Sequence, residues 1–522
     1  MASMNNAYAE PSICEQLKNI TFITHSVFDE NDDDSFFIHE WANFFHIDTK
    51  KITLKNEAAF FLQRCNASRE DLSELERHLR QRKFIRDAKV TLNDEDKITV
   101  ETWDNWSLMP TASYGRKGGK NKLALGIKDR NLFGLGIDAE MEYFTNEQHS
   151  GYKFDTEIPL FLNNNTQLAL TFIDSNDGEL YSTFINKYFV GHDTKNAYNI
   201  GFLNANNQTK LFQNGETLST FNHSTRYKNM QWGWLHQDNN KHTLRFYAGL
   251  TQQENTFSVL SVNDIESIDN NKNNQYSLPN DRTFTYPWLG FEYQEKNHKK
   301  LTNIYLINHT EDFNFGWQFN GHIGIADGNK KHSAWALYKI NISKGIQISS
   351  QSMLLFSGEI TGETYKSNDN RILAKLSLEA FHTLNEQWRY YFKNTNVFSK
   401  NQFKDLPISL GGNTSLRGFP LQYQHGENTI LFTSELRYYP QINLFKLFEL
   451  GGVIFWDVGK ASGTSTIKNI DNGWLNSLGI GARFFSTHSS ESQVIHLDLA
   501  FPISDNNQVN GVEIRAETKY AF

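Results

Sequence analysis

The last twelve residues of the chain, Gly511 to Phe522, constrain its fold more than any other stretch. Alternate positions carry charge, with Val512, Ile514, Ala516, Thr518, Tyr520 and Phe522 on one face and Glu513, Arg515, Glu517 and Lys519 on the other. This period of two predicts a strand with one face in an apolar medium and one in water. A strand of about ten residues that ends in aromatics is typical of a transmembrane β-barrel, which satisfies all its backbone hydrogen bonds between strands. The alternative is an amphipathic strand of a soluble sandwich.

Composition favours the barrel. The 522 residues are only 39% hydrophobic, with a mean hydropathy of -0.57, and no run of about 18 apolar residues could form a membrane-spanning helix. Aromatic residues nevertheless make up 14% of the chain. A barrel accommodates both facts, because its lumen and loops are polar while its lipid-facing band and girdles are aromatic. The net charge of -8 is mild and the basic residues are dispersed, which argues against nucleic acid as a partner.

The first residues carry signs of export. Ala7-Tyr8-Ala9 before Glu10 has the small-x-small form of a signal-peptidase site, although no apolar secretory segment is present. We therefore interpret residues 1–17 as the N-terminal segment of a mature protein. Cys14 and Cys65 could form a disulfide in an oxidising periplasm, and the alternative is two unrelated thiols.

Residues 18–104 differ in texture from the rest of the chain and predict a small α+β domain. Ser68 to Asp71 offers a helix N-cap, and leucines follow at helical spacing at positions 72, 75 and 79. The order is strand, helices, strand, strand. The predicted strands are Ile20–Phe28, Ala88–Leu92 and Ile98–Trp103, and the predicted helices are Asp71–Gln81 and, with weaker signals, Glu40–Ile47 and Asn56–Gln63.

Residues 105–522 predict the barrel. Alternating segments recur between Asn, Gly and Asp turns, and acids fall on one face of strand after strand, as in Asp138, Glu140 and Glu142. Such acids suit a wet lumen and would be costly in a dry sandwich core. The candidates number between roughly sixteen and about twenty, and the count should be even. We expect Ser261 to Asn280 to form a long external loop, because turns at the other end tend to be short.

Two motifs in this region carry a family resemblance. Gly411 to Pro420 (GGNTSLRGFP) and Phe455 to Gly459 (FWDVG) look like the lumen-loop and strand motifs of the outer-membrane protein 85 superfamily, the BamA/TamA-like group. Ser434 to Pro440 (SELRYYP) and Asp129 to Gly136 (DRNLFGLG) are also similar to it. The resemblance implies a barrel of about sixteen strands, with residues 416–419 on a loop folded into the lumen.

The resemblance also implies roles for single residues. Leu416, Arg417, Gly418 and Phe419 form the lumen-loop motif, Phe455, Asp457 and Gly459 form the strand that anchors it, Glu435 and Arg437 support them, and Tyr520 and Phe522 end the barrel as its C-terminal signal. An arginine inside a barrel must find an acceptor or remain costly, so we predict an ion pair between Arg417 and Asp457. The alternative is a solvated Arg417 and an ordinary lumen acid at 457.

The N-terminal domain resembles a single polypeptide-transport-associated (POTRA) domain, with Phe84 to Val90 at the place of that family's aromatic residue and following strand. Such a domain can bind an extended client by β-augmentation, so we expect an edge strand that its own helices leave uncovered. The alternative is a spacer or plug. We further predict a weak seam between Ser107–Gly115, which contains Pro110, and Gly511–Phe522.

The resulting hypothesis is an outer-membrane polypeptide translocase or barrel insertase of a Gram-negative bacterium, with the POTRA domain in the periplasm. Its expected partners are extended polypeptide clients, outer-membrane lipid and lipopolysaccharide, and accessory periplasmic proteins or lipoproteins. No cofactor and no metal are expected, because nucleotide, hydrolase and zinc motifs are absent and His39, Glu40 and His46 lie among aromatics. A passive pore or receptor is the alternative function, and a lumenal hydrolase is a third.

Overall fold

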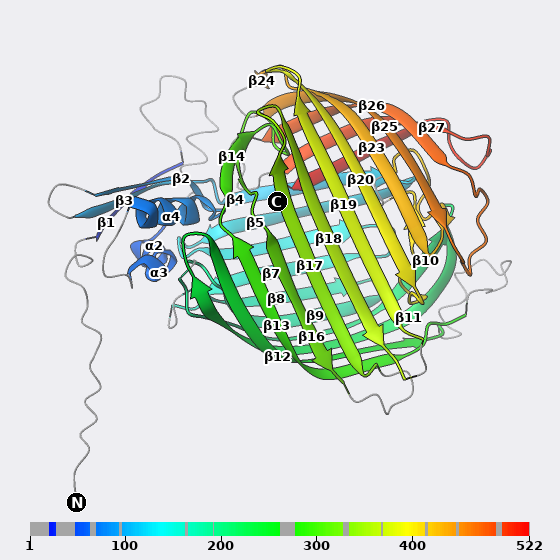
Figure 1. Ribbon diagram of the computed structural model, residues 1–522, viewed down its shortest axis with the longest axis horizontal. Coiled ribbons are helices and arrows are strands. Elements are labelled where there is room, and N and C mark those ends of the chain that lie inside the picture. The colour runs from blue at the N-terminus through cyan, green and yellow to red at the C-terminus, as the bar shows by residue number, and fades with distance from the viewer. Residues whose placement is uncertain are drawn as a thin grey trace, which may run out of the picture.

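The computed structural model describes residues 20–27, 47–62, 69–92, 97–161, 165–191, 193–260, 277–326, 334–366, 369–412, 416–444, 448–486 and 493–520. The chain is mainly β, with a small N-terminal unit at one end of a wide closed barrel (Figure 1). We call the barrel end next to this unit the inner end, and the opposite end the outer end. Among the described residues, no helix has the length and apolar character needed to cross a membrane.

The N-terminal unit has the predicted order of elements. They are β1 (Ile20–His25), α2 (Lys51–Glu57), α3 (Ala59–Leu62), α4 (Arg69–Arg80), β2 (Ile85–Leu92) and β3 (Ile98–Asp104). The sheet order is β1-β3-β2, with β1 parallel to β3. Leu72, Leu75 and Leu79 of α4 are buried against the sheet, as their spacing predicts. The helix predicted at Glu40–Ile47 lies almost wholly outside the described residues.

The barrel wall contains twenty strands among the described residues, so the expectation of about sixteen is wrong, although the even count holds. They are β4 (Leu108–Lys117), β5 (Lys120–Leu132), β6 (Ile137–Thr145), β7 (Ser150–Pro159), β8 (Thr166–Ser175), β9 (Gly178–Lys187), β10 (Asn196–Gln213), β11 (Glu216–Asp238), β12 (His242–Ser258), β13 (Arg282–Glu295), β16 (Gln318–Ile325), β17 (Ala336–Gln347), β18 (Ser352–Thr364), β19 (Arg371–Thr383), β20 (Trp388–Lys400), β23 (Asn428–Tyr438), β25 (Phe448–Ser462), β26 (Leu475–Ser486), β27 (Gln493–Ile503) and β28 (Glu513–Tyr520). Alternation looks the same in a wall strand and in a projecting hairpin, so only the pairing decides the count.

The two faces of the wall divide as the sequence predicts. On β28, Ile514 is 63% exposed on the outside, while Arg515 is 3% exposed on the inside. The same alternation places Met141 of β6 outward and its neighbour Glu140 beside an internal cavity. Apolar side chains thus face outward around the wall and the charged ones face the lumen, which is the arrangement of a barrel in lipid.

Short turns join most strands at the inner end, but β13 and β16 are joined by a longer segment, residues 296–317. This segment, which we call the inner insertion, contains the hairpin β14 (His298–Thr302) and β15 (Thr310–Asn314). The expectation of short inner turns therefore fails here. The predicted external loop at 261–280 does connect β12 to β13 at the outer end, but residues 261–276 are outside the described part of the chain.

The N-terminal unit is attached to the wall through the turn that follows β5. The Lys50 N–H and the Thr53 hydroxyl both donate to the Gly134 carbonyl, at 2.9 and 2.8 Å. The Asn131 side-chain amide donates to the Thr49 hydroxyl at 2.8 Å. Gly134 has a φ of 71°, and a Cβ there would lie 2.4 Å from the Asp48 carbonyl oxygen, so glycine permits this close approach. The DRNLFGLG segment noted in the sequence thus forms the contact between the two parts.

Candidate functional site

Arg417 lies inside the barrel and forms the predicted ion pair. Its Nε and Nη2 atoms donate to the two carboxylate oxygens of Asp457, at 2.6 and 2.8 Å, and its Nη1 donates to Glu435 at 3.0 Å. The guanidinium lies 3.4 Å from the centroid of the Phe455 ring. Arg417 is 4% exposed and Asp457 is fully buried, so the alternative of a solvated Arg417 is wrong.

Glu435 extends this pair into a larger network of buried charges. Its second oxygen accepts from Arg437 Nε at 2.8 Å. On the other side, Arg417 Nη1 lies 3.6 Å from Asp498, which accepts from Arg483 at 2.6 Å. Three arginines and three carboxylates therefore offset one another, which a set of buried charges requires. No sequence motif pointed to Asp498 or Arg483, although Asp498 lies between the apolar residues Leu497 and Leu499 in an alternating segment of the kind that marks a lumen-facing acid.

The segment between β20 and β23, residues 401–427, folds inward and carries Arg417. The two-residue strands β21 (Ser409–Leu410) and β22 (Gln424–His425) pair at its base. Leu416 and Phe419 are fully buried in an apolar cluster within the barrel. Gly418 has a φ of 90° and packs against Ser477 and Pro502, so a side chain there would be strained. Gly459 on β25 gives Leu410 room, because a Cβ there would lie 3.2 Å from its Cδ1.

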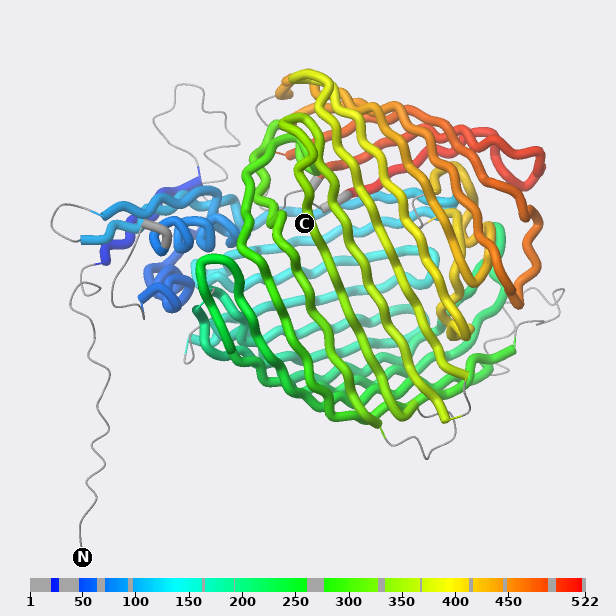
Figure 2. Tube along the Cα trace, in the orientation of Figure 1, coloured from blue at the N-terminus to red at the C-terminus, as the bar shows by residue number. Residues whose placement is uncertain are grey.

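This inward loop spans the outer end of the lumen (Figure 2). Near Arg417 it is bound to β25, and beyond Phe419 it reaches the tip of the β10–β11 hairpin, where the Gly215 N–H donates to the Leu421 carbonyl at 2.8 Å. The Leu421 N–H in turn donates to the Gly118 carbonyl between β4 and β5 at 3.3 Å. In the order around the barrel, β25 and β10 lie ten strands apart, on opposite sides of a wall of twenty.

The barrel closes where β28 meets β4, and this seam is weak. The two strands share one residue pair, Ala516 with Arg116, whereas β27 and β28 share eight pairs and β4 and β5 share ten. Among the described residues, two contacts reinforce the outer part of the seam: Lys117 pairs with Glu517, and the Gly118 N–H donates to Glu513. Glu513 also accepts from the Gly418 N–H at 2.7 Å, so the inward loop holds the outer end of the seam. The predicted weak junction is confirmed.

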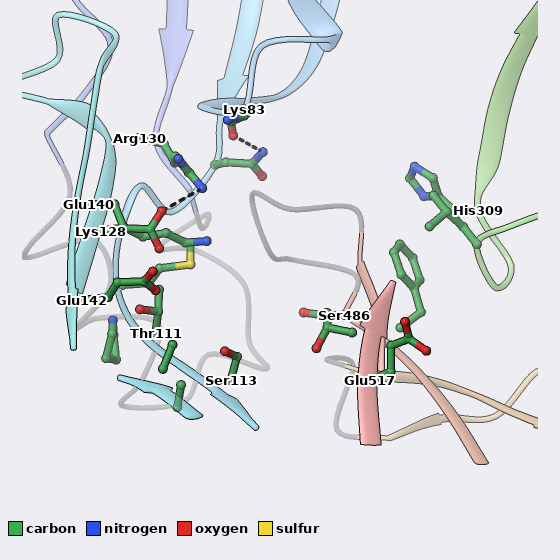
Figure 3. A pocket seen from close by; sticks show the side chains of 18 of the residues that line it. Lys83, Thr111, Ser113, Lys128, Arg130, Glu140, Glu142, His309, Ser486 and Glu517 are labelled. Atoms are coloured by element: carbon green, nitrogen blue, oxygen red, sulfur yellow. Dashed lines mark hydrogen bonds and ion pairs between the residues drawn. The ribbon is translucent and has the colours of Figure 1, made fainter. Parts of the chain in front are cut away.

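A polar cavity of about 1050 Å³ lies beside the inner part of the seam. Lys83 and neighbouring residues of the N-terminal unit line one side, together with Lys128, Arg130, Glu140 and Glu142 of the wall (Figure 3). His309 of the inner insertion, Ser486 and Glu517 lie across from them (Figure 3). Residues 109–115 of β4 border the same space. The cavity therefore joins the N-terminal unit, the edge of β4 and the inner insertion.

One edge of the N-terminal sheet departs from the expectation. On β2, the Val90 N–H donates to the Glu76 carboxylate at 3.2 Å, and the Ala88 carbonyl accepts from Arg80 at 3.4 Å. The Ala88 N–H donates to its neighbour Asp87 at 2.8 Å. Side chains of α4 thus bind two main-chain groups in the middle of the β2 edge, and Asp87 of β2 itself binds a third. Covering an edge with charged side chains is a common way to prevent strand addition.

Some predicted positions cannot be placed. Cys14, Cys65 and Phe522 lie outside the described residues, and the side chain of Tyr520, at the end of β28, is not described. Arg437 is found next to Glu435 and also reaches the inner insertion, which no sequence motif predicted. Only the unusual length of the segment between the alternating stretches at 282–295 and 318–325 could have drawn attention to that insertion.

Comparison with known proteins gives one family match and several similar folds. Residues 332–484 match the model of the haemolysin secretion/activation protein family ShlB/FhaC/HecB, a segment that contains Arg417, Glu435 and Asp457 but less than a third of the chain. BamA from Haemophilus ducreyi lacking POTRA domains 1–3 is 13% identical, with 96% of this chain and 84% of that chain covered and a TM-score of 0.44. CdiB from Escherichia coli is 12% identical, with 97% and 76% covered and a TM-score of 0.47. No curated protein matches.

The same comparison finds the FrpB iron transporter of Neisseria meningitidis, 10% identical over 81% of this chain and 84% of that chain, with a TM-score of 0.41. The finer assignment to the BamA/TamA-like group, and the single POTRA domain, stay predictions.

Proposed function

We propose that this protein is a polypeptide translocase or barrel insertase of the outer membrane of a Gram-negative bacterium. In this proposal residues 18–104 are a POTRA domain in the periplasm that receives extended polypeptide clients. Lipid and lipopolysaccharide surround the barrel, and accessory periplasmic proteins or lipoproteins could deliver clients. The family match across the Arg417 network supports this assignment.

The observation that carries the proposal is the one-pair seam beside the inner cavity. Opening β4 from β28 breaks few backbone hydrogen bonds, and the main-chain groups of β4 can then pair with a client strand. The cavity lies between this edge and the N-terminal unit, so a client held there has a short path to the seam. Such strand exchange needs no nucleotide, because the folding of the client supplies the free energy.

The alternative of a passive pore is disfavoured by what lies inside the barrel. The inward loop spans the outer end, and the inner insertion packs against the wall at the inner end. Segments folded into the lumen at both ends narrow the path for ions, so we expect a lower conductance than that of an unfilled barrel of this size.

The decisive experiment is a disulfide across the seam in a C14S/C65S background. Cysteines at 116 and 516, the one paired position, should lock β4 to β28 and abolish client insertion or secretion in proteoliposomes. The matched control joins 497 to 516, which uses the same Ala516→Cys substitution but locks β27 to β28, a ladder that need not open. Full activity in the verified 116–516 crosslinked form would exclude a lateral gate.

Deleting residues 10–101 separates a docking domain from a spacer. If the N-terminal unit receives clients, the truncated barrel should stay folded and membrane-inserted but lose client handling. Unchanged delivery would show that the unit is a spacer. Because α4 covers the β2 edge, Glu76→Ala should increase client binding if β2 is the docking strand and leave it unchanged if another edge is used.

A further inference from the structure

We propose that the inner insertion occupies, in cis, a binding groove for an apolar polypeptide segment on the inner part of the lumen wall. The groove lies on the lumen face of β18, β19 and β20. Its natural occupant during transport would be a client segment, and only that part of the inference rests on the proposed function. The groove itself is defined by the contacts that the insertion makes now.

The wall beneath the insertion is apolar, unlike the wall beyond it. Met353, Phe381 and Tyr391 on three adjacent strands form one buried cluster with Ile304 and Phe315 of the insertion. Four residues further toward the outer end, on the same face of the same strands, the side chains are hydroxyls: Ser357, Ser377 and Thr395, which line a second cavity of about 350 Å³. A lumen needs polar side chains where water reaches it, so the apolar patch is suited to a covering segment.

Arg437 holds the insertion by a hydrogen bond to the main chain of the insertion. Its Nη1 donates to the Ile304 carbonyl at 3.0 Å, while its guanidinium lies 3.7 Å from the centroid of the Tyr391 ring and its Nε is bonded to Glu435. Every peptide has carbonyl groups, so this contact places little demand on the sequence of the occupant. Selectivity comes from the apolar patch, which accepts the Ile304 side chain.

Glu379 adds a polar contact at the edge of the groove. Its carboxylate accepts from the Tyr305 hydroxyl at 3.3 Å and from the wall residue Tyr391 at 2.8 Å. The groove as occupied therefore favours an aliphatic residue followed by an aromatic residue with a hydroxyl. Side chains of this chemistry are also typical of the outward face and the aromatic girdle of a barrel wall.

The insertion can leave the wall without leaving its own backbone N–H groups unpaired. Glu311, within the insertion, accepts from the N–H groups of Ile304 and Tyr305, at 2.9 and 3.0 Å. These donors do not depend on the wall, so displacement exposes mainly apolar surface, which a client of similar composition would cover again. The insertion also borders the cavity that reaches Lys83 of the N-terminal unit (Figure 3), so a client could enter the groove from that side.

The test uses the full chain with residues 303–309 replaced by a short Gly-Ser linker, and a fluorescent peptide of residues 300–312 as the probe. We expect the purified linker variant to bind the peptide at least tenfold more tightly than the wild type, whose groove is occupied. A scrambled peptide should not bind. Arg437→Gln in the linker background should weaken binding about tenfold, whereas Glu386→Gln, an exposed inner-end residue, should have no effect. Equal binding by linker variant and wild type, or by both peptides, would overturn the proposal.

A second variant covers the case in which the linker variant does not fold. Ile304→Asp keeps the chain length and expels the insertion by placing a charge in the apolar cluster, so it should also bind the peptide. In planar bilayers, the peptide should reduce the conductance of this variant. Peptide binding requires no client transport. Peptide binding without transport activity would support the groove and reject the proposed function. Transport activity without peptide binding would support the proposed function and reject the groove.

Discussion

The barrel holds two internal segments by different physics. The inward loop at the outer end is held by buried charges from three strands, whereas the inner insertion is held by an apolar patch and main-chain contacts. A buried charge without its partners is strongly unfavourable, so the loop has one acceptable position. Apolar surface accepts any segment of suitable volume. The outer loop is therefore built to stay in place, and the insertion is built to be exchanged.

The strongest test of this contrast is Arg417→Ala. It would leave Asp457 and Glu435 buried without their shared arginine, and we expect the unfolding free energy of the barrel to fall by about 3–5 kcal/mol. Denaturant unfolding in detergent micelles, followed by heat modifiability on gels, measures the change. Arg417→Lys is the matched variant, because it keeps the charge but loses the bidentate geometry, and its loss should be smaller. Equal stability of Arg417→Ala and the wild type would refute a charge-anchored loop.

The corresponding change in the insertion is Ile304→Ala. It removes buried apolar contacts and should destabilise the docked insertion by about 2–3 kcal/mol, near the low end for a core truncation because this segment can rearrange. Unlike Arg417→Ala, it should leave global unfolding of the barrel nearly unchanged. Hydrogen exchange of residues 303–309, compared with that of β18, measures the local effect. Loss of protection in both segments would mean that the insertion is an integral part of the barrel core.

A third variant asks whether the two segments are coupled. Glu435 binds both Arg417 and Arg437, and Arg437 binds the insertion, so Arg437→Gln should loosen the outer loop as well. We expect a coupling of about 1 kcal/mol, seen as roughly fivefold faster alkylation of a cysteine placed at Leu421. Lys393→Gln is the control, because Lys393 lies on the same wall and pairs with Glu379. An unchanged rate at position 421 would make the two segments independent.

The N-terminal unit offers a further test of how buried charges act, because its buried pair of His78 and Glu57 contains a histidine, which can titrate near neutral pH. Burial lowers the pKa of His78 more than its hydrogen bond to Glu57 raises it. Burial raises the pKa of Glu57, but the His78 hydrogen bond and the charge of Arg82 bring it below its ordinary value. As the pH is lowered, the unfolded chain therefore takes up these protons at a higher pH than the folded chain does. The free energy of unfolding falls as the pH drops below about 6.5, and again below about 4.5, by at most about 1.4 kcal/mol per pH unit for each group.

Limited proteolysis of the full chain in urea between pH 7.5 and 5 measures this effect. His78→Gln keeps a donor for Glu57 but cannot titrate, so the dependence between pH 7 and 5 should disappear. A wild-type profile that stays flat over this range would mean that His78 takes up its proton without unfolding.

The smallest expected effect is that of Tyr305→Phe. It removes only the hydroxyl that donates to Glu379, which keeps its bonds to Tyr391 and Lys393. We expect the docked insertion to lose about 0.5 kcal/mol, the low end for a hydrogen bond, because Glu379 stays paired. Hydrogen exchange of residues 303–309 should show a change smaller than that of Ile304→Ala. A larger change than Ile304→Ala would mean that polar contacts, and not the apolar patch, hold the insertion.

Sequence alone determined the nature of the wall, because alternation with a period of two tells which side chains meet lipid and which meet water whatever their partners. The helix α4 could be predicted for a similar reason, because the spacing of its leucines is a local pattern. Two short motifs were enough to predict the Arg417–Asp457 pair.

Tertiary structure decided the count of twenty strands, the single residue pair at the seam, the covered edge of β2 and the part of the wall on which the inner insertion packs. Each of these depends on contacts between residues far apart in the chain, such as Ala516 with Arg116 or Arg437 with Ile304. Local pattern does not encode which strand lies beside which, because backbone hydrogen bonds are the same for every sequence and the choice between partners is made by packing of the whole barrel.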